Sequence, residues 1–387
     1  MKLLLKKKKP FILGTLAFVI FAALLSLGVF IAITYYNKFQ SKELSLIKQS
    51  LDFQKELTKL KNEDQFLRNN KLETEIKNIQ DAYKKSLASY ERILDLRQYE
   101  KTDKFDEQFA KTLEYLSERN YSSASSFLAS LDDQLKKEKF ANSSSVVPEN
   151  VTASNAPPAS GYSLQRVNSD AGSFTVAIVS GDLNSTRVTV DTASESDCKD
   201  NCPVLPLSDY VSRNQAYAGI NGSYFCPATY PTCAGKTNSF DLLVMNKNKT
   251  YFNSDNNVYS TNPLVVFLGS SVRFVVKGSD WGRDNGNDGV LMNYPMLLGG
   301  GNVVYGGDAD AKHNNKGGRS FVANKGNTVY IGVVFNATVM ESAKTLQALG
   351  MENALNLDDG GSTALWFQGY KAGPGRNIPN AILFIRK

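Results

Sequence analysis

The chain has 387 residues, of which 21% are charged and 42% are hydrophobic, and its formal net charge is +6. This length allows two or three domains, and the composition is ordinary for a globular protein with a membrane segment. Five lysines lie among the first nine residues and the rest of the chain is close to neutral, so we expect no nucleic-acid partner.

Residues 1–36 predict a short basic tail followed by a transmembrane helix. Phe11 to Tyr35 carries no charged residue, and at about 1.5 Å per residue it can cross a hydrocarbon core of roughly 30 Å. The preceding lysines predict a cytoplasmic N-terminus. A cleaved signal peptide is the alternative, but the apolar run is long for one and no convincing cleavage site follows. We therefore expect a single-pass signal anchor in the cell membrane, with the remainder extracytoplasmic.

Residues 37–140 predict an extracytoplasmic helical stalk or small bundle, because they contain neither proline nor glycine. Apolar side chains recur at steps of three and four. These stripes are Leu72, Ile76, Ile79, Tyr83, Leu87, Tyr90 and Leu94; Phe109, Leu113 and Leu116; and Tyr121, Ala124, Leu128, Leu131 and Leu135. Breaks near Tyr99–Asp103 and Arg119–Tyr121 indicate separate helices. The stripes fit a coiled coil that forms a homo-oligomer as well as a bundle that packs on itself.

Residues 141–161 have the serine- and proline-rich composition of a flexible linker. From Tyr162 to the end, short β-branched or aromatic runs alternate with clusters of Gly, Asn and Asp. The expected strands are Phe174–Val179, Arg187–Asp191, Pro263–Leu268, Val272–Val276, Val329–Phe335, Ala354–Leu357, Ala364–Phe367 and Ala381–Ile385. One helix is expected at Glu341–Leu349, with Gly350 as its C-cap. Residues 162–387 therefore predict an α+β domain built on a mixed, largely antiparallel sheet.

Four cysteines, Cys198, Cys202, Cys226 and Cys233, all lie in this last domain. An even number in an oxidising compartment indicates two disulfides. Three pairings are open, and the local pairs Cys198–Cys202 and Cys226–Cys233 are the simplest. The spacings fit a four-cysteine zinc site poorly, and we expect no metal and no cofactor.

Three motifs follow one another in the domain. They are Asn221-Gly222-Ser223-Tyr224-Phe225, Gly318-Arg319-Ser320 and Asn356-Leu357-Asp358-Asp359-Gly360-Gly361-Ser362. Their order resembles the phosphodiester glycosidase family over about residues 162–387. The closing segment Arg376-Asn377-Ile378-Pro379-Asn380-Ala381-Ile382 resembles the last strand of that family.

The resemblance implies a substrate in which a sugar is linked through its anomeric oxygen to a phosphodiester. Its hydrolysis passes through an oxocarbenium-like transition state, so a carboxylate must stabilise positive charge or act as nucleophile or base. Asp358 matches the essential carboxylate; capping the turn is its alternative role. The leaving phosphate needs little protonation, and Arg319 is expected to bind it through a bidentate fork. A surface arginine is the alternative.

Other motif residues are expected to shape or line the substrate site. Asn221 would bind sugar hydroxyls and Tyr224 would stack on the ring, unless Tyr224 is a core residue and Gly222 a turn residue. Gly222, Gly360, Gly361 and Ser362 complete the expected substrate- and phosphate-binding set.

Three further residues are less well determined by the pattern. Asp359 stands where the family has glycine and tolerates positive φ less well, but it would supply a second carboxylate. Glu341 either caps its helix or provides a second carboxylate. His313 is the only histidine, which excludes a multi-histidine metal site; we expect it exposed on a loop, with a general acid near Arg319 as the alternative. Asp308 and Asp310 are expected in a solvated turn.

Together these features predict a membrane-anchored, extracytoplasmic glycosidase acting on sugar-1-phosphodiesters in envelope or exopolysaccharide glycans. The alternative is a non-catalytic protein that binds glycans with the same fold and helps to assemble the envelope.

Overall fold

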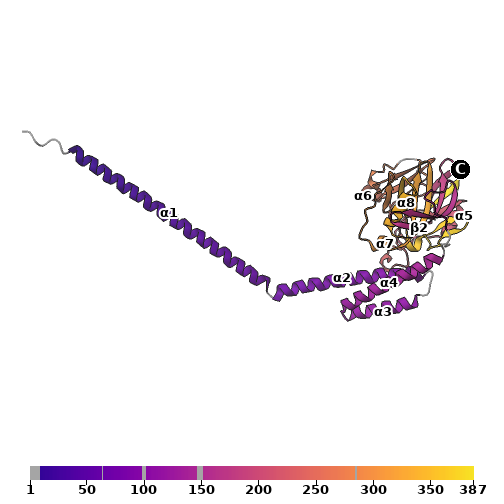
Figure 1. Ribbon diagram of the computed structural model, residues 1–387, viewed down its shortest axis with the longest axis horizontal. Helices are drawn as coiled ribbons and strands as arrows, with labels where there is room; N and C mark the ends of the chain where they lie inside the picture. The colour runs from indigo at the N-terminus through magenta and orange to yellow at the C-terminus, as the bar shows by residue number, and fades with distance from the viewer. Residues whose placement is uncertain (1–8, 63, 98–101, 146–150, 284–285) are drawn as a thin grey trace, which may run out of the picture. The chain divides into compact units, whose positions relative to one another are not determined.

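The computed structural model describes residues 9–62, 64–97, 102–145, 151–283 and 286–387 (Figure 1). The chain divides into two compact units, Met1–Gln80 and Asp81–Lys387. The first unit contains α1 (Lys9–Lys61) and the start of α2 (Asp64–Arg97). Among the described residues, the helix over Phe18–Lys61 contains an 18-residue window that is apolar enough to cross a membrane, with a mean hydropathy of 2.4 and none of the window buried. The expected apolar N-terminal helix is therefore present, although a signal sequence has the same properties.

The second unit begins with a small helical bundle. The end of α2 packs with α3 (Asp103–Ser117) and α4 (Tyr121–Ser145), which confirms the expected break near Arg119–Tyr121. Of the break expected near Tyr99–Asp103, residues up to 101 lie outside the described part, and α3 begins at Asp103. The buried apolar residues that hold these helices together are Ala82, Ile93, Leu96, Phe105, Leu116, Ala124, Leu128, Leu131 and Leu135. The third predicted stripe, on α4, is thus buried within the chain, together with Leu116 of the second.

The first predicted stripe is only partly used in packing. Leu72, Ile76 and Tyr83 are 55%, 52% and 56% exposed. The buried positions of α2 include the small residues Ala82, Ser86 and Ser89 as well as Ile93 and Leu96. Ser89 donates a hydrogen bond to the Asp132 carboxylate of α4 at 2.9 Å. Small side chains let two helices approach closely, which apolar periodicity alone does not predict. Oligomerisation through the exposed part of this stripe remains a prediction.

The segment expected as a linker is partly structured. Helix α4 continues to Ser145, and residues 146–150 lie outside the described part. Beyond them, Ala153 forms a bridge with Arg166, and the Ser154 amide donates to the Arg166 carbonyl at 2.9 Å. The Asn155 side chain adds a bond to the Asn168 carbonyl at 2.8 Å. Backbone pairing therefore ties these residues to the sheet domain.

Three antiparallel sheets form the rest of the unit, confirming the expected α+β class. The seven-stranded sheet has the order β1-β2-β13-β12-β14-β10-β11. Its strands are β1 (Gly161–Ser169), β2 (Gly172–Asp182), β13 (Thr328–Ala337), β12 (Gly317–Lys325), β14 (Asn353–Asn356), β10 (Met296–Gly299) and β11 (Asn302–Val303).

Two five-stranded sheets complete the domain, with the orders β16-β15-β4-β17-β3 and β6-β5-β9-β7-β8. The first contains β16 (Tyr370–Ala372), β15 (Leu365–Phe367), β4 (Ala218–Asn221), β17 (Asn380–Arg386) and β3 (Thr186–Thr192). The second contains β6 (Tyr251–Phe252), β5 (Val244–Met245), β9 (Gly289–Met292), β7 (Leu264–Leu268) and β8 (Ser271–Val275). Short helical segments connect them: α5 (Leu207–Arg213), η1 (Pro231–Cys233), α6 (Asn256–Tyr259), η2 (Gly278–Asp280), α7 (Ala311–Asn314), α8 (Val339–Ala348) and η3 (Gly360–Ser362).

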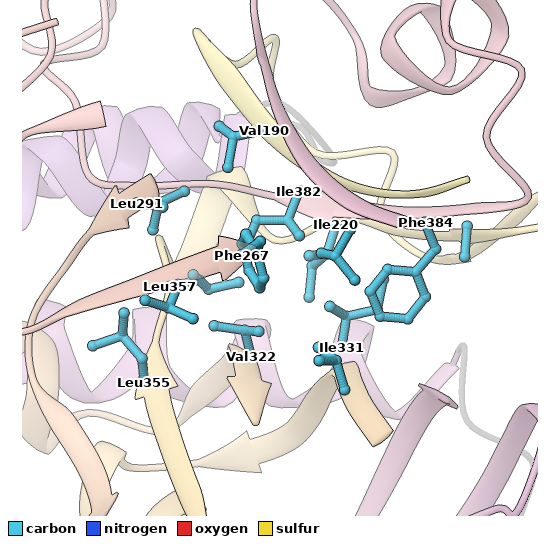
Figure 2. Close-up of a cluster of buried hydrophobic side chains, with 14 of the residues drawn as sticks. Val190, Ile220, Phe267, Leu291, Val322, Ile331, Leu355, Leu357, Ile382 and Phe384 are labelled. Carbon is cyan, nitrogen blue, oxygen red and sulfur yellow. The ribbon is translucent and has the colours of Figure 1, made fainter. Parts of the chain in front are cut away.

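One buried core joins the apolar faces of all three sheets. Figure 2 shows side chains from each: Val190, Ile220, Ile382 and Phe384 from the β4–β17–β3 sheet, Val322, Ile331 and Leu355 from the seven-stranded sheet, and Phe267 and Leu291 from the third. Burial of this many apolar side chains is the main stabilising term for the domain. It also fixes the strand ends, and with them the turns that follow those ends.

The predicted C-terminal helix is confirmed as α8. The Thr338 hydroxyl accepts from the Glu341 amide at 3.1 Å and the Glu341 carboxylate accepts from the Thr338 amide at 2.7 Å. This capping box satisfies two backbone donors that a helix N-terminus leaves unpaired. The helix ends before Gly350, whose φ of 72° suits glycine.

The two local disulfides are present. Cys198 pairs with Cys202 and Cys226 pairs with Cys233, and no free cysteine remains among the described residues. Both bridges close short loops on the chain segment between β3 and β5.

Candidate active site

Two antiparallel strand pairings position residues 358–362, which we call the aspartate turn. Phe321 of β12 lies opposite Asn356 at the end of β14, and the Leu357 amide donates to the Ser320 carbonyl at 2.9 Å. The chain then turns through η3 and enters β15, which pairs with β4. The turn thus joins the seven-stranded sheet to the β4–β17–β3 sheet and lies beside the start of β12.

Asp359 occupies the glycine position of the motif without backbone strain. Its φ of −122° lies in the extended region, and the positive φ of 64° falls on Gly360 instead. Aspartate is therefore compatible with the backbone at this position, because the following glycine, and not Asp359, takes the left-handed conformation.

The Asp359 carboxylate forms a buried ion pair with Arg319. Arg319 Nη1 lies 2.9 Å from Asp359 Oδ2, and the two side chains are only 5% and 9% exposed. Asp359 also accepts from the Ser320 amide at 3.1 Å and from Asn356 Nδ2 at 2.9 Å. A buried charge of this kind is retained only when it is paired and hydrogen-bonded, as this one is.

The guanidinium of Arg319 is occupied by protein oxygens at all three nitrogens. Nε donates to the Ala337 carbonyl at 2.9 Å, and Nη2 donates to the carbonyls of Lys312, at 2.8 Å, and Asn315. Nη1 is the nitrogen that binds Asp359. This geometry favours a role in holding the turn and the preceding loop over the expected direct role in binding phosphate.

Asp358 is the buried carboxylate of the turn with the most perturbed acidity. It is 9% exposed, and burial raises the pKa of its carboxyl from 3.8 to about 7. A hydrogen bond from Ser362 and the charge of Arg376 lower the pKa, whereas the charge of Asp359 raises it further. The Asp359 amide donates to Asp358 Oδ1 at 2.9 Å. Asp358 therefore changes charge near neutral pH, as acid–base and nucleophilic carboxylates in active sites do.

Asn221 and Gly222 support Asp358 from β4. Asn221 is fully buried; its amide donates to the Asp358 carbonyl at 2.7 Å, and its oxygen accepts from the Ser320 hydroxyl at 2.8 Å. The Gly222 carbonyl accepts from the Asp358 amide at 2.9 Å. A Cβ on Gly222 would lie 1.7 Å from Asn380 Oδ1, so only glycine fits there. This burial favours a framework role for Asn221 over contact with a sugar.

Tyr224 is partly buried and lies between His313 and the turn. Its hydroxyl is 3.3 Å from His313 Nε2, and Asn356 Nδ2 donates to it at 2.9 Å. Burial, followed by the nearby charges of Asp359 and Asp358, raises the pKa of Tyr224 well above 10. Neither expected role, stacking on a sugar ring or packing in the core, accounts for the hydrogen bonds that the phenol oxygen makes with His313 and Asn356.

His313 is buried rather than exposed, which corrects the expectation for this loop. Its ring is 8% exposed and is surrounded by the rings of Tyr224, Tyr294 and Tyr305. Its Nδ1 lies 2.7 Å from Asp308 Oδ2, so Asp308 is also more than part of a solvated turn. The cause is the short helix α7, which turns the histidine inward, and a sequence pattern of loop residues does not reveal it.

Arg376 is a site residue to which sequence reasoning gave no role, although it begins the closing family motif. Its guanidinium lies over the Tyr230 ring, 5.0 Å from the centroid, and Nη2 is 3.4 Å from the Tyr230 hydroxyl. A Cβ on Gly361 would lie 2.3 Å from Arg376 Nη2. Gly361 therefore allows the guanidinium to approach the turn that carries Asp358.

The remaining carboxylate candidate has a structural partner of its own. Glu341 caps α8, and its Oε1 lies 3.0 Å from Lys316 Nζ. These contacts favour the capping alternative over a second catalytic carboxylate. Within the described residues, no group of three or more His, Cys, Asp and Glu side chains is arranged to hold a metal ion.

Comparison with solved structures finds distant similarity. A hypothetical protein from Synechocystis is 15% identical with a TM-score of 0.41, and the match covers 58% of this chain and 62% of that one, less than two thirds of its length. The catalytic domain of zebrafish N-acetylglucosamine-1-phosphodiester alpha-N-acetylglucosaminidase, auto-inhibited by its pro-peptide, is 16% identical with a TM-score of 0.47. That match covers 62% of this chain and 87% of the zebrafish chain. No curated protein matches the sequence.

The family comparison bears directly on the ordered motifs. Residues 214–385 match the family model for phosphodiester glycosidases. This range includes the asparagine–glycine motif after β4, the Arg319 motif, the aspartate turn and the closing segment with Arg376. The resemblance predicted from the order of the motifs is therefore confirmed over residues 214–385, which match the phosphodiester glycosidase family.

Proposed function

We propose that this chain is an extracytoplasmic glycosidase that hydrolyses the bond between the anomeric carbon of a sugar and a phosphodiester. The observation that carries the proposal is Asp358, a buried carboxylate on a glycine-rich turn whose pKa is raised to about 7. The family match over residues 214–385 supports the class of reaction.

Asp358 is assigned to the developing sugar cation. As the bond to the phosphate breaks, positive charge grows at the anomeric carbon and ring oxygen. An ionised carboxylate in a site of low dielectric stabilises that charge more strongly than it would in water. The same carboxylate has the chemistry of a nucleophile or a base, and each of these roles requires the ionised form. Activity should therefore rise with pH through about pH 7.

Arg376 is assigned to the departing phosphate in place of Arg319. Its charge already acts on Asp358, and it is only partly buried. A guanidinium binds phosphate oxygens through two parallel hydrogen bonds and neutralises charge without donating a proton. A phosphomonoester is a weak base, so this neutralisation meets most of the demand of the leaving group.

Arg319, Asp359 and Asn221 are assigned to the framework that aims Asp358. Their bonds to one another and to the backbone fix the turn from β12 and β4. A rigid framework lowers the reorganisation needed at the moment of reaction.

The N-terminal part and the cysteines support the proposed extracytoplasmic location. The apolar helix α1, preceded by lysines, suits a membrane anchor with a cytoplasmic N-terminus. The two disulfides suit an oxidising compartment. Envelope or exopolysaccharide sugar phosphates are the substrates within reach of such an enzyme. Protease added to intact cells should remove the sheet domain. If the sheet domain is protected in cells that are verified to be sealed, the proposed orientation is wrong.

Asp358→Asn provides the central test of the activity. The full chain, purified in detergent, is assayed for free sugar released from a panel of alpha-linked sugar-1-phosphodiesters. The variant keeps the shape and removes the charge, so turnover should fall by about three orders of magnitude or more, as for loss of a main electrostatic group. Asp209→Asn, at an exposed aspartate on α5, is the matched control and should retain wild-type turnover.

Two outcomes would overturn the proposal in different ways. Wild-type turnover by Asp358→Asn would remove Asp358 from the chemistry. No sugar release by the wild type on the whole panel, together with binding of the same glycans, would favour a non-catalytic glycan-binding protein. The engagement of Arg319 by Asp359 and backbone carbonyls is the observation that keeps this second function under consideration.

A further inference from the structure

A hydrogen-bonded chain of three side chains leads from the protein surface to the candidate active site. Asp308 Oδ2 lies 2.7 Å from His313 Nδ1, and His313 Nε2 lies 3.3 Å from the Tyr224 hydroxyl. Asn356 Nδ2 links the far end to the turn, since it lies 2.9 Å from both Tyr224 Oη and Asp359 Oδ2. The Asp308 side chain is 24% exposed and His313 is 8% exposed, so burial increases along the chain.

The chemistry of the partners fixes the direction of each bond. An ionised carboxylate only accepts, so His313 Nδ1 carries a proton and donates to Asp308. In neutral His313 the other nitrogen, Nε2, then has only a lone pair, and the Tyr224 hydroxyl donates to it. The phenol oxygen at the same time accepts from Asn356. In this state the Tyr224 hydroxyl uses its single proton in the hydrogen bond to His313 and cannot donate to another group.

Protonation of His313 must reverse the central bond. Imidazolium donates from both nitrogens, so Nε2–H then points at the Tyr224 oxygen. That oxygen now accepts from His313 and from Asn356, and its own proton has to turn to another acceptor. We propose that His313 is a positioning residue whose protonation turns the Tyr224 hydroxyl from a donor to His313 into a donor to the phosphate oxygens of the substrate.

The surrounding groups favour this arrangement. Burial raises the pKa of Asp308, but hydrogen bonds from His313 and from the Asp310 amide outweigh it and the pKa is lowered, so the carboxylate stays ionised. Tyr294 faces the histidine ring and donates its hydroxyl to Asp308 at 3.2 Å, and Tyr305 meets the ring edge-on. The raised pKa of Tyr224 keeps the phenol protonated, and it therefore acts as a donor and not as a phenolate.

Charges beyond these rings come from two further elements. Arg319 of β12 donates to the Lys312 carbonyl next to the histidine, and Asp359 is reached through Asn356. These two charges are paired with each other, so protonation of His313 does not require either of them to lose its partner. The inference rests on the proposed function for the identity of the acceptor, but the hydrogen-bonded chain itself is independent of it.

The unique histidine makes the chain directly observable. In the full-length protein, labelled with ¹⁵N-histidine and purified in detergent without a histidine tag, the ring signals come from His313 alone. At pH 8.5 we expect Nδ1 to be protonated and Nε2 to be a hydrogen-bonded acceptor. Tyr224→Phe should shift the Nε2 signal, whereas Tyr294→Phe, which changes a ring neighbour without a bond to Nε2, should leave the tautomer unchanged. A protonated Nε2 in the neutral wild type would overturn the proposal.

Coupling to an anionic ligand provides the second readout, with glucose 1-phosphate as the probe. The probe should prefer the state in which Tyr224 donates to it, which is the state with protonated His313. Saturation with glucose 1-phosphate should therefore move the protonation of His313 Nε2 to higher pH, by about one unit for a tenfold preference. Tyr224→Phe should abolish the shift. If the bound probe leaves the His313 titration unchanged, the proposal is wrong. If the shift occurs but no phosphodiester is hydrolysed, the proposed activity fails while the proton switch stands.

Discussion

The loops around Arg319 and Arg376 both bring a guanidinium to the same aspartate turn, but in different surroundings. Arg319 is buried, forms an ion pair with Asp359 and donates to three backbone carbonyls. Arg376 is partly exposed, lies over Tyr230 and acts on Asp358 through its charge. The difference supports the proposal that the buried motif arginine Arg319 serves as framework, whereas Arg376 on a neighbouring loop is the arginine assigned to the phosphate. The predictions below test whether the pair Arg319–Asp359 acts as framework and the pair Arg376–Asp358 acts on the substrate.

The largest expected effect is on folding when Arg319 is removed. Arg319→Met leaves Asp359 as an uncompensated buried charge, so the free energy of unfolding should fall by about 3–5 kcal/mol. Urea denaturation followed by tryptophan fluorescence measures this change, because Trp281 and Trp366, the only tryptophans, both lie in the sheet domain. Adding Asp359→Asn should recover part of the loss. A variant as stable as the exposed-site control Arg386→Met would contradict the framework role.

The next effect concerns the pH dependence of stability that Asp358 confers. Its folded-state pKa of about 7 lies above the unfolded value of 3.8, so its contribution is complete below pH 4 and is lost as pH rises to about 7. The full span is on the order of 4 kcal/mol. Asp358→Asn should therefore gain stability relative to the wild type between pH 4 and pH 8, as measured by urea midpoints. Parallel curves for the two proteins would show that the carboxyl is not perturbed; Asp209→Asn should run parallel to the wild type.

A smaller effect, on catalysis alone, is expected from Arg376→Lys. The variant keeps the charge and loses the planar fork, so kcat/KM for a sugar-1-phosphodiester should fall roughly 10- to 100-fold, the equivalent of one charged hydrogen bond. The urea midpoint should stay at the wild-type value, in contrast to Arg319→Met. Arg386→Lys, on the exposed end of β17, provides the control. Equal losses of stability and activity would place Arg376 in the framework.

The smallest effect tests the contact between the turn and Arg376. In Gly361→Ala the new methyl group would lie 2.3 Å from Arg376 Nη2, and the flexible side chain must move away. We expect about a tenfold loss of kcat/KM, since small overpacking costs about 1–3 kcal/mol. Gly282→Ala has no heavy atom within 4 Å of the new methyl group and should be neutral. Unchanged activity in Gly361→Ala would show that the position of Arg376 is not critical.

The fold was largely predictable because it depends on local patterns. Apolar periodicity located α4, the run Glu341–Leu349 before Gly350 located α8, and β-branched runs located β2, β3, β7 and β13. The pattern was only partly right on α2: Tyr90 stacks on Phe109, but Leu72 and Ile76 are exposed, and the small residues Ala82, Ser86 and Ser89 are buried. Packing there depends on how closely α4 approaches, which is a property of the partner helix.

The candidate site was predictable in its motifs but not in its contacts. The order of motifs identified Asp358 and the family, yet the partner of Arg319 is 40 residues away in the chain and occupies a position where the family has glycine. The inward turn of His313 depends on α7 and on three tyrosines from other segments. Such roles follow from tertiary neighbours, so the residue type and its spacing do not determine them.

Strand β17 has a consequence for how the domain is made. It inserts between β3 and β4, with Ala381 opposite both Asp191 and Asn221, and it follows them in the chain by well over a hundred residues. During synthesis, β3 and β4 emerge first and their facing edges stay open until residues 380–386 arrive. Arg376 arrives shortly before that strand, so the sheet closes and the candidate site assembles in the same late step. A chain stalled earlier would expose these open strand edges and be prone to aggregate, and its candidate site would be incomplete.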